Sequence, residues 1–78
     1  MNDCEVLRLL QERLAEARQK HPDWSGGRFC ALSVLKMELA ELEHAMAFES
    51  PARMKDEALD VAAVALRIVA GEAKGDVA

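Results

Sequence analysis

The stretch KMELAELEHAMAFESPARMKDEALDVAAVALR, which runs from Lys36 to Arg67, decides how this chain folds. It carries four carboxylates in two pairs: Glu38 with Glu41, and Glu57 with Asp60. The members of a pair are three residues apart, so on a helix they lie about one turn apart on the same side. A Ser50-Pro51 break separates the two pairs. If the flanking helices fold back antiparallel at this break, the pairs come face to face.

The convergence of four acidic groups predicts a metal site. Such groups repel one another at neutral pH unless a divalent cation lies among them, and carboxylate-only sets suit Mg2+, with Mn2+ as the alternative. Glu57 lies in the middle of the apolar stripe formed by Met54, Val61, Val64 and Ile68, and Asp60 lies at its edge. Carboxylates in such stripes are usually paired, neutralised or metal-bound. Ordinary surface acids on Glu-rich helices are the competing interpretation.

Apolar spacing and capping signals predict an all-α fold with three main helices per chain, arranged as an antiparallel helical bundle. The expected helices run from about Cys4 to Lys20, from about Phe29 to Phe48, and from Pro51 to about Ala70. Asn2 or Asp3, Ser50 and Gly71 provide the caps. The expected buried stripes are Leu7, Leu10, Leu14 and Ala17 on the first helix, and Leu32, Leu35, Leu39, Leu42 and Met46 on the second.

Length and composition place further limits on the chain. Its 78 residues suit a single domain, 1–78, with residues 1–3 and 72–78 frayed. A net charge of -4 without a basic patch argues against nucleic acid as a partner. The absence of a long apolar run or a leader-like start predicts no membrane association and a cytoplasmic location. Cys4 and Cys30 are then expected to be reduced thiols.

The third helix also predicts assembly. Its side opposite Glu57 carries Leu59, Ala62, Ala63, Leu66 and Ala70, so the helix is apolar nearly all round. A helix of that kind is buried on both sides. Three helices of one chain do not cover both sides. The pattern therefore predicts that homo-oligomerisation, as a homodimer or a dimer of dimers, completes the bundle through this helix.

The run VLKMELAELEHAM, followed by DEALDVAAVALRIV, resembles the MazG-like all-α nucleoside triphosphate pyrophosphohydrolases of the small phage and bacterial type. Their signature is E-x-x-E, a variable gap and E-x-x-D, and here 15 residues separate Glu41 from Glu57. The HPDW segment that begins at His21 is also similar to these proteins. Met37 and Ala40 depart from the family pattern, which more often has an acid and a glycine at these positions.

The resemblance implies Mg2+-dependent hydrolysis of a (deoxy)nucleoside triphosphate to the monophosphate and pyrophosphate, an activity suited to house-cleaning of nucleotide pools. Metal ligands would be the four motif acids, Glu38, Glu41, Glu57 and Asp60. Glu41 would also orient or deprotonate the attacking water. Arg53, Lys55 and Arg67 would bind phosphate, and Trp24 would stack on the base.

Several alternatives stay open at the level of sequence. Trp24 can instead plug the end of a small bundle. Glu41-x-x-His44 matches the E-x-x-H pattern of di-iron carboxylate bundles, although His44 is expected to face solvent. A non-catalytic helical dimer that acts as an interaction protein is the remaining candidate.

Overall fold

The computed structural model describes residues 1–22, 24 and 27–73, which form three helices: α1 (Asp3–Lys20), α2 (Gly27–Phe48) and α3 (Pro51–Val69). These confirm the three expected helices to within two residues at each end. Residues 1–3 were expected to fray, but Asp3 is already the first residue of α1. Of the other end expected to fray, residues 74–78 lie outside the described ranges. The loop expected between His21 and Gly27 falls partly on residues that are not described, and Gly27 already begins α2.

The helix ends follow from local chemistry. The Asn2 side chain accepts a hydrogen bond from the Glu5 amide at 2.9 Å, and Ser50 accepts one from the Arg53 amide at 3.2 Å, so both residues are N-caps. Gly71 ends α3 with a φ of 79°, a conformation that glycine adopts without strain. Its amide and that of Glu72 donate back to the carbonyls of Ile68 and Arg67.

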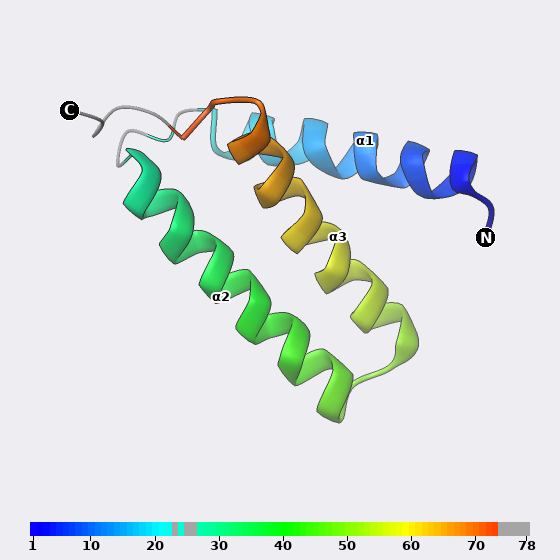
Figure 1. The fold of residues 1–78 in the computed structure, drawn as a ribbon. Helices are drawn as coiled ribbons and strands as arrows, with labels where there is room; N and C mark the ends of the chain where they lie inside the picture. The colour runs from blue at the N-terminus through cyan, green and yellow to red at the C-terminus, as the bar shows by residue number, and fades with distance from the viewer. Residues whose placement is uncertain (23, 25–26, 74–78) are drawn as a thin grey trace.

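The helices α2 and α3 form an antiparallel hairpin, and α1 crosses α3 (Figure 1). Within the described ranges, α1 packs on α3 and makes no comparable contact with α2. Two arginines join α1 to α3. Arg13 binds the side chains of Asp56 and Asp60, and Arg67 binds the carbonyls of Ala17 and His21. No helix in the described part of the chain is long and apolar enough to span a membrane.

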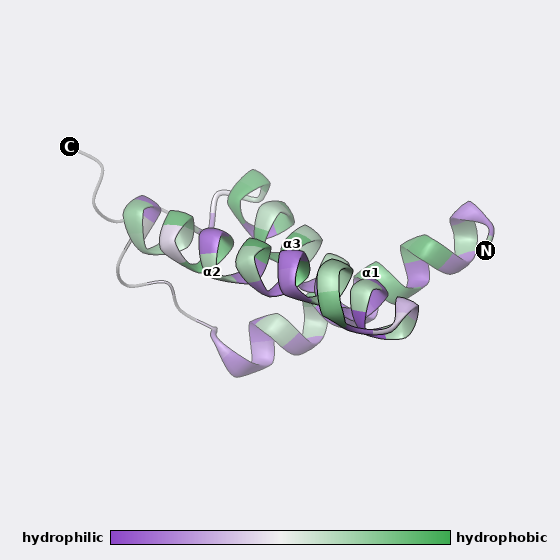
Figure 2. Cartoon of the chain, turned by 90° about the horizontal axis from the view of Figure 1, so that it is seen from below, coloured by the Kyte–Doolittle hydropathy of each residue, from purple (hydrophilic) through white to green (hydrophobic). Residues whose placement is uncertain are grey.

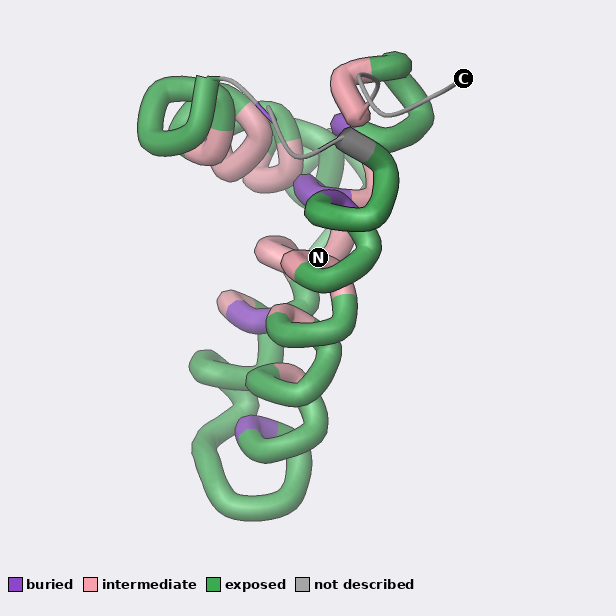
Figure 3. The backbone as a smooth tube through the Cα atoms, turned by 90° about the vertical axis from the view of Figure 1, so that its left-hand side faces the viewer, coloured by how far each residue is buried: buried purple, intermediate pink, exposed green. Residues whose placement is uncertain are grey.

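The core of one chain is small (Figure 3). Its buried apolar residues among those described are Trp24, Ala31, Ala45, Ala63 and Val64. Leu35 is half-buried against this core, whereas Leu32, Leu39 and Met46 of the same predicted stripe are exposed. The prediction for α2 was therefore wrong by about a quarter turn. The face turned to α3 carries Ala31 and Ala45, whose small side chains let the two helices approach closely. The half-buried Glu38 lies between them on the same face.

On α1 the predicted stripe is only partly covered. Leu10, Leu14 and Ala17 are half-buried, and Leu7 is exposed. Cys4 and Cys30 are exposed and free.

Candidate metal centre

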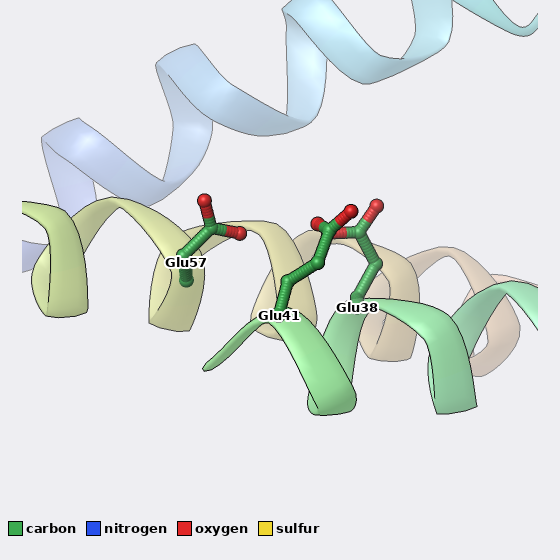
Figure 4. A group of neighbouring side chains, drawn as sticks. All are labelled: Glu38, Glu41 and Glu57. Atoms are coloured by element: carbon green, nitrogen blue, oxygen red, sulfur yellow. The ribbon is translucent and has the colours of Figure 1, made fainter. Parts of the chain in front are cut away.

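Three of the four predicted acids come together. Glu38 and Glu41 project from α2 and Glu57 projects from α3, toward the side of the hairpin on which α1 runs (Figure 4). One carboxylate oxygen from each residue lies within 4.8 Å of the other two. The antiparallel hairpin thus produces the face-to-face arrangement that the sequence predicts for these three residues. We refer to them below as the acid cluster.

Burial makes the acid cluster unusual. Glu57 is only 7% exposed, and one carboxylate oxygen of Glu57 and one of Glu38 are buried without a hydrogen-bond partner. Such atoms cost roughly 1–3 kcal/mol each, and more when charged. Two of them directed into one group of carboxylates indicate a place for a proton or a cation.

The pKa values of the acid cluster respond to this environment. Burial, and then the neighbouring Glu41 carboxylate, raise the pKa of Glu38 to about 7. Burial also raises the pKa of Glu57, although the positive charge of Arg53 partly opposes that rise. Glu38 therefore binds a proton more readily near neutral pH than an ordinary glutamate does, and a bound cation would displace that proton.

Arg53 is the cation that the structure places against the acid cluster. Its guanidinium donates to Glu57 at 2.5 Å and to Glu49 at 3.3 Å. The side chain is half exposed and lines a shallow depression with Glu41 and Glu57. One positive charge does not balance three carboxylates, so Arg53 neutralises the acid cluster only in part.

Asp60, the fourth predicted ligand, is held elsewhere. Its carboxylate accepts a hydrogen bond from Arg13 at 2.6 Å, and the same guanidinium binds Asp56 at 3.0 Å. Asp60 lies close enough to raise the pKa of Glu38, but it does not belong to the three-residue group. Sequence analysis missed Arg13. The available signal was its place beside the apolar stripe of α1, where a cation needs an acidic partner.

Trp24 and Arg67, both predicted to bind substrate, lie at the end of the core. The Arg67 guanidinium stacks on the Trp24 ring at 4.4 Å, and the two residues are 2% and 8% exposed. Arg67 also donates to the His21 carbonyl at 2.6 Å and to Glu72 at 2.7 Å. With the bond to the Ala17 carbonyl, these contacts engage all three guanidinium nitrogens of Arg67, and they favour the interpretation of Trp24 as a plug over that of an open stacking platform.

A cavity of about 430 Å³ lies between Glu38 of the acid cluster and Trp24. It lies between the three helices, with Glu38 and Asp60 in one part of its wall and Trp24 and Arg67 in another. Lys20 and His21 add basic character, and Val34, Ala63 and Val64 give it an apolar lining. A cavity of this size with polar and apolar walls suits a small-molecule ligand.

Two further predicted residues do not join the acid cluster. Lys55 precedes Glu57 by two positions, which turns it about 160° away around α3. His44 is exposed and pairs with Glu49 at 3.1 Å, and it is not a member of the group of candidate ligands. The structure thus gives no support to an E-x-x-H iron site.

Comparisons with protein-family models, curated proteins and solved structures gave no match to this chain.

Proposed function

We propose that this chain is a Mg2+-dependent nucleoside triphosphate pyrophosphohydrolase, which converts a (deoxy)nucleoside triphosphate and water to the monophosphate and pyrophosphate. The observation that carries the proposal is the pair of buried, unpartnered oxygens of Glu38 and Glu57 within the acid cluster. The resemblance of the motif region to the MazG-like family implies the substrate class, and the adjoining cavity supplies space for such a substrate.

In this proposal Glu38, Glu41 and Glu57 hold the cation, with Mn2+ as an alternative to Mg2+. A bound Mg2+ ion would neutralise phosphate charge and lower the pKa of an attacking water. Asp60 remains bound to Arg13 and acts on the acid cluster only through its negative charge, which raises the pKa of Glu38.

Glu41 is the proposed catalytic base. It is the exposed member of the acid cluster, so a water can reach it. The water oxygen bonds to the α-phosphorus, its proton passes to Glu41, and the bond from that phosphorus to the bridging oxygen breaks to release pyrophosphate.

The substrate is proposed to use the cavity for its nucleoside part. Its phosphates would then point past Glu38 toward Arg53, whose half-exposed guanidinium can turn from Glu57 to phosphate. Lys55 has no role in this proposal because it lies on the other side of α3. Arg67 and Trp24 contribute by forming the end wall of the cavity.

The test is pyrophosphate release from a panel of canonical and modified nucleoside triphosphates with Mg2+ or Mn2+. We expect turnover with the unaltered chain and with Glu43→Gln, which changes an exposed glutamate of α2 outside the acid cluster. We expect loss of at least about a hundredfold with Glu57→Gln. Equal turnover in Glu57→Gln, or no release from any nucleotide, would overturn the proposal.

A second candidate is a non-catalytic helical interaction protein, which the exposed apolar residues of α2 and α3 favour. It predicts that Glu57→Ala raises the melting temperature by removing a buried carboxylate, and that Mg2+ has no effect. The pyrophosphohydrolase proposal predicts that Mg2+ raises the melting temperature and that Glu57→Ala abolishes the rise.

A further inference from the structure

Arg53 is shared between one buried carboxylate and two carboxylates that water reaches. Its guanidinium lies 2.5 Å from Glu57, 3.3 Å from Glu49 and 3.5 Å from Asp56. The side chain of Glu57 is 9% exposed, whereas those of Glu49 and Asp56 are 32% and 44% exposed. Figure 2 shows hydrophilic stretches among the apolar ones along α2 and α3, and these four charged residues lie where the two helices join.

Each guanidinium nitrogen of Arg53 has its own partner. Nε faces Glu49, Nη1 faces Asp56 and Nη2 donates to Glu57. The backbone of Arg53 is fixed, because its amide donates to the Ser50 side chain at the start of α3. The side chain itself is half exposed. A small rotation of the guanidinium can therefore break the bond to Glu57 while Nε and Nη1 stay near their partners.

The two carboxylate oxygens of Glu57 differ. Oε1 accepts the hydrogen bond from Arg53, whereas Oε2 is buried without a hydrogen-bond partner. Glu57 as a whole is 7% exposed and belongs to the acid cluster with Glu38 and Glu41. A buried carboxylate needs a positive charge beside it, and Arg53 is the cation that the structure places there. Arg53 thus acts on Glu57 as a bound metal ion would.

A divalent cation in the acid cluster would change the balance at Glu57. It would supply the positive charge that Glu57 obtains from Arg53, and it would repel the guanidinium across a short, partly buried distance. Leaving Glu57 costs Arg53 one of its three ion pairs, since Glu49 and Asp56 remain within reach. Cation binding and the bond between Arg53 and Glu57 therefore oppose each other.

We propose that Arg53 is a built-in counter-ion that competes with the metal for Glu57, and that its guanidinium moves to Glu49 and Asp56 when a cation binds. The proposal rests on the metal centre of the proposed function and adds an order of events to it. Nη2 is released only after the cation has bound, and it then faces the depression that Arg53 lines. Cation binding therefore prepares Arg53 to donate to a phosphate oxygen.

The first test is a calorimetric titration of Mn2+ into the unaltered chain and Arg53→Gln at pH 7.5 and low ionic strength. Arg53→Gln should bind Mn2+ about tenfold more tightly, because the competing charge is gone. If Arg53 instead supported Glu57 as a ligand, this variant would bind more weakly. Lys55→Gln is the matched control. It removes the same charge from an exposed position turned away from Glu57, and its affinity should change by less than about twofold.

The second test asks where the guanidinium goes. Glu49→Gln removes one of the two carboxylates that receive Arg53, so it should weaken Mn2+ binding by about fivefold. In the Arg53→Gln background the same change should alter the affinity by less than about twofold, because the effect acts through Arg53. If Arg53→Gln fails to fold, Glu49→Gln is compared with Glu43→Gln, an exposed acid outside the acid cluster, and must bind more weakly.

Three results would overturn the proposal. These are Mn2+ affinity in Arg53→Gln that is equal to or weaker than that of the unaltered chain, equal tightening in Lys55→Gln, and a Glu49→Gln effect that persists without Arg53. No readout involves nucleotide. Pyrophosphate release without tightening in Arg53→Gln would reject the role of Arg53 alone, and tightening without release would reject the hydrolysis alone. Absence of Mn2+ binding in every variant would reject the metal centre and this proposal with it.

Discussion

Glu38 and Glu57 are carboxylic acids placed where burial disfavours their charge. In the absence of a cation, the pKa of Glu38 is about 7 in the folded chain against 4.5 when unfolded, and the pKa of Glu57 is also raised. Between these two pH values the folded chain keeps a proton that the unfolded chain has lost. The stability that protonated Glu38 provides is therefore complete below pH 4.5 and is lost as the pH rises through about 7.

The raised pKa of Glu38 gives a prediction for the metal-free chain. With a chelator present, the melting temperature should fall between pH 5 and pH 8, and Glu38→Gln should reduce that fall, because an amide does not titrate in this range. Glu43→Gln, which changes an exposed acid on the same helix, should leave the fall in melting temperature unchanged. Melting curves followed by circular dichroism provide the measurement. A melting temperature that does not fall, or a fall unchanged in Glu38→Gln, would show that Glu38 is not the titrating group.

Arg67 is a second residue whose role follows from burial. It is 2% exposed and is bound to Glu72 and to the carbonyls of Ala17 and His21. Arg67→Met keeps the apolar stem but removes the hydrogen bonds to the Ala17 and His21 carbonyls and one of the two arginine partners of Glu72, so we expect a loss of about 2–4 kcal/mol in the free energy of unfolding. Arg18→Met removes the exposed partner of the same Glu72, and its cost should stay below about 1 kcal/mol. Urea denaturation of the two variants makes the comparison, and equal losses would contradict the role of Arg67.

At the scale of elements, α1 is the helix that depends on ion pairs. None of its residues is buried, and Arg13 binds Asp56 and Asp60 of α3. Arg13→Gln should therefore lower the free energy of unfolding by about 1–3 kcal/mol and speed amide hydrogen exchange in α1. Arg8→Gln breaks an exposed pair within α1 and should change little. Exchange in α1 that is unaffected by Arg13→Gln would mean that apolar contacts alone hold this helix.

The elements also show what the sequence can predict. The helix boundaries rest on local signals such as Asn2, Ser50-Pro51 and Gly71, and these are readable from neighbouring residues. Glu38, Glu41 and Glu57 come together because of their spacing along α2 and α3 and the antiparallel reversal at Ser50-Pro51. By contrast, the diversion of Asp60 to Arg13 depends on the crossing of α1 over α3, which no spacing encodes.

The inward face of α2 was mispredicted for a related reason. Periodicity marks Leu32, Leu39 and Met46 as apolar and does not say whether their partner belongs to the same chain. Within the chain, α3 packs against the smaller Ala31 and Ala45. The larger residues are left exposed.

At the scale of the whole molecule, the acid cluster projects toward the side of the hairpin on which α1 runs, whereas Leu32, Leu39 and Met46 are exposed on α2. Glu41 lies about 160° around α2 from Leu39, so an association of two chains through these apolar residues leaves Glu41 accessible. We therefore expect the mass measured by ultracentrifugation to be the same with Mg2+ and with a chelator, even though Mg2+ raises the melting temperature. A mass that changes with Mg2+ would show that the acid cluster takes part in assembly.

The measurement that tests the central claim most directly is a calorimetric titration of Mn2+ into the unaltered chain, Glu57→Gln and Glu43→Gln at pH 7.5. We predict saturable binding to the unaltered chain and to Glu43→Gln, with proton release. In Glu57→Gln the affinity should be at least about tenfold weaker, because an amide replaces the buried carboxylate. Binding of equal strength to all three proteins, or no binding to the unaltered chain, would contradict the assignment of Glu38, Glu41 and Glu57 as a metal centre.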